Sequence, residues 1–241
     1  MEIIVEQNYD SLSKKAAEIV KEEMMKKKDL VLGLATGSTP LGLYKELIKM
    51  HKEEGLDFSK VTTFNLDEYI GIDYQDPNSY HYYMENNLFN HINIDRNNTF
   101  IPDANRKDIE SYCREYDRLI EEKGGIDLQI LGIGINGHIG FNEPDEELNV
   151  GTSIVNLTES TIKANSRFFD SIDQVPKKAI TMGVGTILKA KKILLLANGK
   201  SKHEAIKKLS RNNKITTNFP ASLLLIHPNV TIIVDEDAYR G

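Results

Sequence analysis

Residues 30–48 decide the fold class, and they read Leu-Val-Leu-Gly-Leu-Ala-Thr-Gly-Ser-Thr-Pro-Leu-Gly-Leu-Tyr-Lys-Glu-Leu-Ile. The first six residues form a short apolar run that is typical of a strand buried on both faces. Pro40 stands where the first residue of a helix would be, and apolar residues follow at helical spacing at Leu41, Tyr44, Leu47 and Ile48. A buried strand, a loop and an amphipathic helix in this order predict one unit of an α/β protein.

The same alternation continues along the chain on both sides of this unit. Helical spacing of apolar residues predicts helices at about 12–20, 79–90, 109–120 and 201–209. We expect further strands at about 61–66, 126–133, 179–182, 193–197 and 230–234. We therefore expect an α/β fold with an open, mostly parallel sheet and helices on both faces. No segment resembles a linker or a repeat, so we expect one domain over residues 1–241.

Composition restricts the class of protein further. The chain has 241 residues, with 36 Asp plus Glu against 30 Lys plus Arg, and a formal net charge of -6. This balance argues against binding nucleic acid or an anionic membrane, whereas a small phosphorylated substrate needs only a local positive pocket. Cys113 is the single cysteine, which excludes a disulfide scaffold. We find neither a secretory signal nor an apolar run of the ~20 residues that span a bilayer, and we expect a cytoplasmic protein.

The loop Thr36-Gly37-Ser38-Thr39 is the first candidate site. Its small residues let backbone N–H groups approach an anion, its hydroxyls add donors, and the start of the following helix contributes a favourable dipole. It is not a Walker A loop, because no Gly-Lys-Ser/Thr follows Gly33 at the required spacing. A turn with a helix cap explains the same residues without a ligand.

Two further loops carry acid–base residues. Asp67 and Glu68 follow the strand expected at 61–66 and could supply a general base, a metal ligand or a helix cap. Residues 132–144 contain His138 and Glu143, and their first part matches the dinucleotide fingerprint G-x-G-x-x-G. We reject a dinucleotide site because later glycines and a proline interrupt the helix that should follow. The glycines more simply bend the backbone around a ligand and present an acid–base pair, whose spacing does not suit a metal.

Two cations complete the candidate set. Ser201 and Glu204 have capping-box spacing, which places Lys202 in the first turn of a helix, where it opposes the helix dipole. Arg167 is flanked by aromatic residues. A bound anion explains both cations, and so do side chains lying on the surface. Because no cofactor motif appears, the residues together indicate cofactor-free acid–base chemistry on a small phosphorylated metabolite.

Several segments in chain order resemble the glucosamine-6-phosphate deaminase family: residues 33–40, 64–71, 78–81, 132–144 and 165–169. The run Gly-His-Ile-Gly-Phe-Asn-Glu-Pro at 137–144 is the most specific of them. The resemblance implies a Rossmann-like fold. It also implies conversion of glucosamine 6-phosphate and water to fructose 6-phosphate and ammonia in amino-sugar catabolism, without a cofactor.

The same resemblance implies a role for each matching residue. His138 would assist opening of the sugar ring, with Asn136 and Glu143 orienting it. Asp67 would move a proton from C2 to C1 of the open chain. The substrate phosphate would be held by Thr36, Gly37, Ser38, Thr39, Arg167 and Lys202.

The chain departs from the family pattern at two places. Many relatives carry Asp where this chain has Asn136, which leaves Glu143 as the charged partner of His138. Residues 145–157 contain three acidic residues and no Lys or Arg, whereas allosteric hexameric members hold an activator's phosphate there with basic residues. We therefore expect a monomer or small homo-oligomer, with neither a hexamer nor activation by N-acetylglucosamine 6-phosphate.

Two other functions remain open at this point. A 6-phosphogluconolactonase-type hydrolase would use His138 to activate water on an ester. A non-catalytic sugar-phosphate sensor would ordinarily need a DNA-binding domain, for which the chain has no spare length. The glycine-containing polar stretch 145–161 is a candidate lid over the site.

Overall fold

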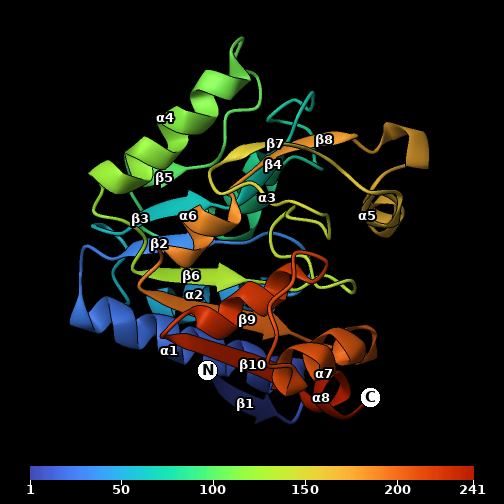
Figure 1. Cartoon of the computed structure of the whole chain (residues 1–241). Coiled ribbons are helices and arrows are strands. Elements are labelled where there is room, and N and C mark those ends of the chain that lie inside the picture. Colours follow the sequence, from blue (N-terminus) through green and yellow to red (C-terminus); the bar gives the residue numbers. More distant parts are fainter.

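The computed structural model describes the backbone of all 241 residues and every side chain except those of residues 160, 164 and 168. Among the described residues, seven strands form one parallel sheet at the centre of the molecule (Figure 1). In spatial order they are β1 (Glu2–Glu6), β10 (Val230–Asp235), β9 (Lys192–Ala197), β6 (Leu128–Leu131), β2 (Val31–Leu34), β3 (Thr62–Asn65) and β5 (Thr99–Phe100). The strand order reverses between β2 and β6, and open sheets of this kind bind ligands beyond the carboxyl ends at such a point.

Helices flank the sheet on both sides (Figure 1). They are α1 (Tyr9–Lys26), α2 (Leu41–Glu54), α3 (Tyr80–Asn87), α4 (Ile109–Glu122), α5 (Glu159–Asn165), α6 (Val184–Leu188), α7 (His203–Arg211) and α8 (Glu236–Arg240). Short 3₁₀ turns lie at η1 (Phe89–His91), η2 (Arg96–Asn98), η3 (Ser166–Phe168), η4 (Ile172–Gln174), η5 (Lys200–Lys202) and η6 (Pro220–Ile226). The expected α/β fold with a mostly parallel sheet is confirmed.

A second, antiparallel sheet follows directly from β3. It contains β4 (Asp67–Tyr69), β8 (Lys178–Thr181) and β7 (Ser153–Asn156), in that order. The strand expected at 179–182 therefore exists, but it is not a strand of the main sheet. The chain leaves the main sheet at Leu66, whose carbonyl accepts from the N–H of Met182 at 2.8 Å. Apolar content predicted the strand correctly but carried no information about its partner.

The start of α7 differs from the expected capping box. Ser201 lies in η5, and α7 begins at His203 with Lys202 at its N-cap and no side-chain cap. The reason lies before the helix: Gly199 has a φ of 83° and donates its N–H to Asp235 at 2.9 Å. The turn at Gly199 leads directly into η5. Ser201 therefore lies in this 3₁₀ turn and not at the N-cap of α7.

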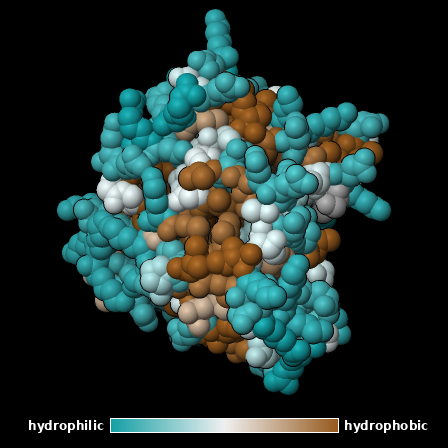
Figure 2. Space-filling model, viewed as in Figure 1, coloured by the Kyte–Doolittle hydropathy of each residue, from teal (hydrophilic) through white to brown (hydrophobic). Residues whose placement is uncertain are grey.

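The main core fills both faces of the parallel sheet. A smaller apolar cluster surrounds the second sheet and includes Tyr69, Ile72, Phe141, Leu157 and Ala179. One face of the molecule is mostly hydrophilic around a band of hydrophobic surface at its centre (Figure 2). No helix among the described residues has the length and apolar character needed to cross a bilayer.

The candidate lid, residues 145–161, is tied down in its first part. The backbone carbonyl of Val150 accepts from Gly185 and Thr186, at 2.9 and 3.1 Å. Thr152 donates both its N–H and its hydroxyl to Asp117 of α4, at 2.8 and 2.6 Å. The middle of the stretch is β7, which pairs with β8. Whether any of this stretch moves stays a prediction.

Candidate active site

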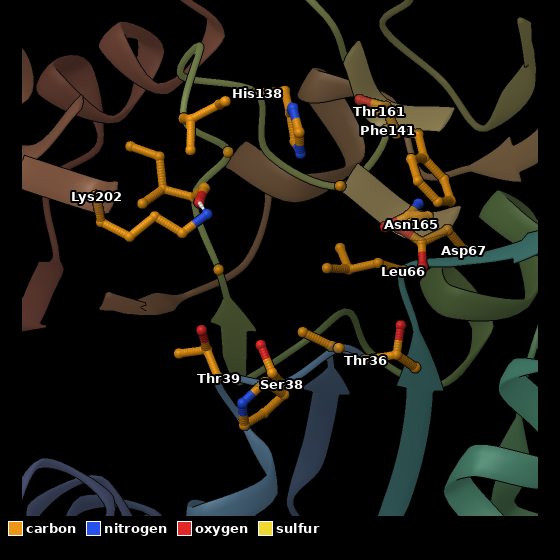
Figure 3. A pocket seen from close by; sticks show the side chains of 18 of the residues that line it. Thr36, Ser38, Thr39, Leu66, Asp67, His138, Phe141, Thr161, Asn165 and Lys202 are labelled. Carbon is orange, nitrogen blue, oxygen red and sulfur yellow. Dashed lines mark hydrogen bonds between the residues drawn. The ribbon is translucent and has the colours of Figure 1, made fainter. Parts of the chain in front are cut away.

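A cavity of about 550 Å³ opens beyond the carboxyl ends of the central strands (Figure 3). Its walls come from the loops after β2, β3, β6 and β9 and from the segment around α5. The residues that the sequence singled out and that line it are Thr36, Gly37, Ser38, Thr39, Asp67, Asn136, His138, Arg167 and Lys202. Glu143 lies behind this wall, where it contacts Asn136 and His138, two residues that line the cavity.

The loop after β2 forms one wall, where Thr36, Ser38 and Thr39 lie together in Figure 3. Gly37 has a φ of 93°, a left-handed conformation that only glycine adopts without strain. The hydroxyl of Ser38 accepts from the guanidinium of Arg167 at 3.4 Å, across 129 residues of sequence. The hydroxyl of Thr39 donates to the side chain of Asn198 at 2.8 Å.

Lys202 faces this loop from the opposite wall (Figure 3). Its ammonium donates to the carbonyl of Ile133 at 2.7 Å. Burial lowers the pKa of Lys202, and the nearby charge of Arg167 lowers it further. A bound anion would relieve both effects, because it would pair with the two cations. Lys202 is half-buried, whereas Arg167 is exposed, and both line the cavity.

The loop after β6 presents His138. Residues 132–152 run as turns and loop, which agrees with rejecting the dinucleotide fingerprint. The carbonyl of His138 accepts from the N–H of Gly134 at 2.9 Å, closing a tight turn. A Cβ at position 134 would lie 2.2 Å from Nδ1 of His138, so any larger residue there would displace the imidazole.

Asn136 and Glu143 fix the tautomer of His138. Nδ1 of His138 lies 2.8 Å from Oδ1 of Asn136 and 3.3 Å from Oε2 of Glu143. The Asn136 amide is oriented in turn, because its Nδ2 donates to Oε2 of Glu143 at 2.7 Å. Both atoms that face Nδ1 are acceptors, so Nδ1 carries the proton and Nε2 is left for the ligand.

Glu143 is a permanent anion in this arrangement. Burial by itself would raise its pKa, but hydrogen bonds from His138, Thr161 and Asn136 and the charge of His138 outweigh it and lower the pKa to about 2. The hydroxyl of Thr161 donates to Oε1 of Glu143. The carboxylate is therefore charged around neutral pH, and it holds the imidazole in place.

Asp67 has the opposite electrostatic character. Its side chain is buried, and burial raises its pKa to about 8, with the charge of Glu68 adding to the shift. Its carboxyl makes no hydrogen bond to any described residue. A buried carboxyl without a donor or cation is poised to receive one from a ligand.

Glu68, the next residue, has a structural role. It is fully buried and accepts from the N–H groups of Tyr80 and His81 at the start of α3, each at 3.0 Å. Its Oε2 also lies 2.8 Å from Nδ1 of His81. The helix-cap interpretation of the acidic pair thus holds for Glu68, and Asp67 is the member that faces the cavity. Alternation along β4 separates the two, because successive side chains of a strand point to opposite faces.

Several lining residues were not assigned a role from the sequence. Tyr80, Thr161, Asn165 and Asn198 all line the cavity. Asn198 directly follows β9, and this position at the carboxyl end of a central strand could have identified it from the sequence. The part of the chain whose side chains are described contains no group of three or more His, Cys, Asp or Glu arranged to hold a metal ion.

Comparison with known proteins gives a consistent family. Residues 5–233 match the model of the glucosamine-6-phosphate isomerases/6-phosphogluconolactonase family. A glucosamine-6-phosphate deaminase of Thermoanaerobacter pseudethanolicus is 60% identical over 238 residues, covering 99% of this chain and 94% of the relative. One from Clostridium perfringens is 57% identical over 240 residues, covering 100% and 99%. The solved structure of a monomeric glucosamine-6-phosphate deaminase is 50% identical, with a TM-score of 0.96 over 99% of this chain and 98% of that one.

Proposed function

Since the chain belongs to the family of glucosamine-6-phosphate isomerases and 6-phosphogluconolactonases, we propose how its own residues divide the work of the deaminase reaction. The enzyme isomerises and deaminates glucosamine 6-phosphate, and the products are fructose 6-phosphate and ammonia. This is a step of amino-sugar catabolism. The role of each residue below is inferred from its position and chemistry in the cavity.

The phosphate end of the substrate lies between the loop after β2 and the two cations. Thr36, Gly37, Ser38 and Thr39 supply hydroxyl and backbone donors, and Arg167 and Lys202 supply charge. A phosphate there would pair with the Lys202 ammonium and offset the lowering of its pKa by burial. The phosphate thus anchors the sugar with its other end toward His138 and Asp67.

Ring opening falls to His138. Its Nε2 takes the proton of the anomeric hydroxyl and returns a proton to the ring oxygen, which leaves an open-chain aldehyde. Asn136 and Glu143 keep the proton on Nδ1 throughout, and Glu143 stabilises the imidazolium that forms transiently.

Asp67 then acts on the open chain. The carbonyl at C1 acidifies the hydrogen at C2. The Asp67 carboxylate removes that proton while the C1 oxygen takes up a proton from the C2 ammonium, which gives an enolamine, and Asp67 then delivers its proton to C1. The C2 nitrogen is then part of a ketimine, and water hydrolyses it to release ammonia. The substrate's C2 ammonium supplies the cation that the buried Asp67 lacks, and its charge favours the ionised carboxylate that the reaction needs.

The partnerless, buried Asp67 is the observation that carries this assignment against a lactonase. A lactone brings no cation to this carboxyl, and hydrolysis of its ester removes no proton from C2, so a hydrolase would have no use for Asp67. We also infer a monomeric, cytoplasmic enzyme working as one domain, because the similar solved deaminase is monomeric and the cavity draws residues from Ala35 to Lys202.

Incubation of the purified protein with glucosamine 6-phosphate, in the presence of a chelator, tests the proposal. Equal amounts of ammonia and fructose 6-phosphate are expected, and Asp67→Asn should stop their formation while the substrate still binds. Hydrolysis of 6-phosphogluconolactone above its background rate, without ammonia from the amino sugar, would favour a lactonase. Binding without turnover of either compound would favour a sensor.

A further inference from the structure

The backbone of the loop after β2 is held from behind by tyrosine hydroxyls. Tyr44 of α2 donates to the carbonyl of Ala35 at 2.5 Å. Tyr83 of α3 donates to the carbonyl of Gly37 at 2.7 Å. Tyr9 of α1 reaches the carbonyls of Ser38 and Thr39, both at 2.9 Å, so its one proton is shared between them. Three helices thus contribute one hydroxyl each to five residues of loop.

These tyrosines lie outside the cavity. None of the three, all of which the structure describes, lines its wall, whereas the loop residues they hold all do. Tyr44 is fully buried, and the rings of Tyr44 and Tyr83 pack edge to face with centroids 6.4 Å apart. Burial raises the pKa of both hydroxyls, so both keep the proton that they donate. The N–H of Gly42 donates to the oxygen of Tyr9 at 2.8 Å and fixes that hydroxyl too.

A hydrogen bond that holds a carbonyl on one side of the loop also directs the N–H of the next residue to the opposite side. In a trans peptide the C=O of one residue and the N–H of the next point in opposite directions, and every peptide bond of this loop is trans. The tyrosines keep the carbonyls of Ala35, Gly37 and Ser38 behind the loop. The N–H groups of the following residues then face away from the tyrosines, and no described residue accepts a hydrogen bond from them. Those residues are Thr36, Ser38 and Thr39.

We propose that Tyr9, Tyr44 and Tyr83 form a clamp of positioning residues, which orients the amides of Thr36, Ser38 and Thr39 toward the substrate phosphate. The proposal rests on the phosphate site of the proposed function. An unclamped loop could turn its carbonyl oxygens toward the phosphate, where they would repel it. The tyrosine hydrogen bonds prevent that alternative conformation. Phosphate binding therefore does not lose the conformational entropy of ordering the loop.

The clamp predicts a selective change in phosphate recognition. Tyr83→Phe and Tyr9→Phe, at half-buried positions, should each raise KM for glucosamine 6-phosphate and the inhibition constant of inorganic phosphate together. The rise should be roughly 2- to 12-fold, the loss expected from one hydrogen bond, with kcat changed less than about twofold. A merely structural tyrosine would lower the melting temperature without raising the phosphate inhibition constant.

Tyr82→Phe is the matched control. Tyr82 neighbours Tyr83 on α3, is 39% exposed, and its hydroxyl makes no hydrogen bond to any described residue, so both constants should keep their wild-type values. Assays run well below the melting temperature of each variant keep stability out of the comparison.

Lys202→Met separates failure of the clamp from failure of the site. If Lys202→Met raises the phosphate inhibition constant and the Tyr9 and Tyr83 variants do not, the phosphate site stands and the clamp is wrong. If Lys202→Met leaves that constant unchanged, the assignment of the phosphate site is wrong, and the clamp proposal is refuted together with it. Parallel rises in all three variants, with Tyr82→Phe unchanged, support the clamp.

Discussion

Replacing Asp67 with asparagine should make the protein more stable while removing its activity. Burial raises the pKa of Asp67 from 3.8 to about 8, so the folded protein holds a proton that the unfolded chain releases. Below pH 3.8 both states are protonated and the carboxyl contributes nothing. As the pH rises to about 8, the unfolded state binds fewer protons than the folded state, and the free energy of unfolding falls. Asparagine is neutral and of the same shape, so it abolishes this loss.

The magnitude follows from the shift. Each pKa unit corresponds to about 1.4 kcal/mol, so wild-type Asp67 costs on the order of 4 kcal/mol at about pH 7. For a chain of this length, roughly 2–4 °C of melting temperature corresponds to 1 kcal/mol. Asp67→Asn should therefore melt on the order of 10 °C above wild type at about pH 7, and close to wild type near pH 4. Its kcat should fall by about 10²- to 10⁴-fold, the usual contribution of a positioned base.

The assay is thermal unfolding of both proteins across this pH range, together with steady-state release of ammonia. Asp57→Asn is the control of opposite sign: hydrogen bonds from the N–H of Ser59 and the amide of Asn93 lower the pKa of Asp57 to about 2. That carboxylate stabilises the folded state above pH 3.8, so its replacement should lower the melting temperature at neutral pH. An Asp67→Asn protein no more stable than wild type at neutral pH, or a gain independent of pH, would refute the reasoning.

Three further predictions concern other residues of the candidate site. Glu143→Gln removes the charge that holds His138, so kcat should fall about tenfold or more in steady-state assays, the effect of a charge-assisted hydrogen bond; an unchanged kcat would contradict the orienting role. Asn136→Asp places a second carboxylate against Glu143, at the 2.7 Å now spanned by a hydrogen bond, so the melting temperature should drop at neutral pH. That drop should shrink toward pH ~4 as a carboxylate takes up a proton, and a drop of constant size would rule out charge repulsion. Lys202→Met should raise KM by about 10- to 100-fold with kcat little changed, and a loss confined to kcat would place Lys202 in the chemistry instead.

The alternation of strands and helices was readable because it is local. Short runs rich in apolar and β-branched residues mark β2, β3, β6, β9 and β10, and all were predicted within a few residues of their observed bounds. Parallel strands direct their carboxyl ends to one edge of the sheet, so the loops after them had to converge there. The sequence therefore predicts that Thr36, Asp67 and His138 lie close together, and all three line one cavity.

Strands and helices with weak local sequence patterns were not predicted. β1 is an edge strand whose side chains are exposed or half-buried, and β7 is likewise only partly buried. β5 is two residues long, and α6 and α8 are five each. Apolar periodicity needs more residues, or more complete burial, than these elements have.

The sequence by itself determined the class of fold, the loops that meet at the site and the chemical types gathered there. Only the tertiary structure decided which of Asp67 and Glu68 faces the cavity, that β8 pairs with β4, and that Lys202 reaches Ile133 across 69 residues. It also brought Tyr9 against Ser38, 29 residues away. The physical reason is the sequence distance over which each property is determined. A strand or helix is selected by the spacing of neighbouring residues. Long-range hydrogen bonds, burial and pKa values depend on which distant segments the packed core brings into contact.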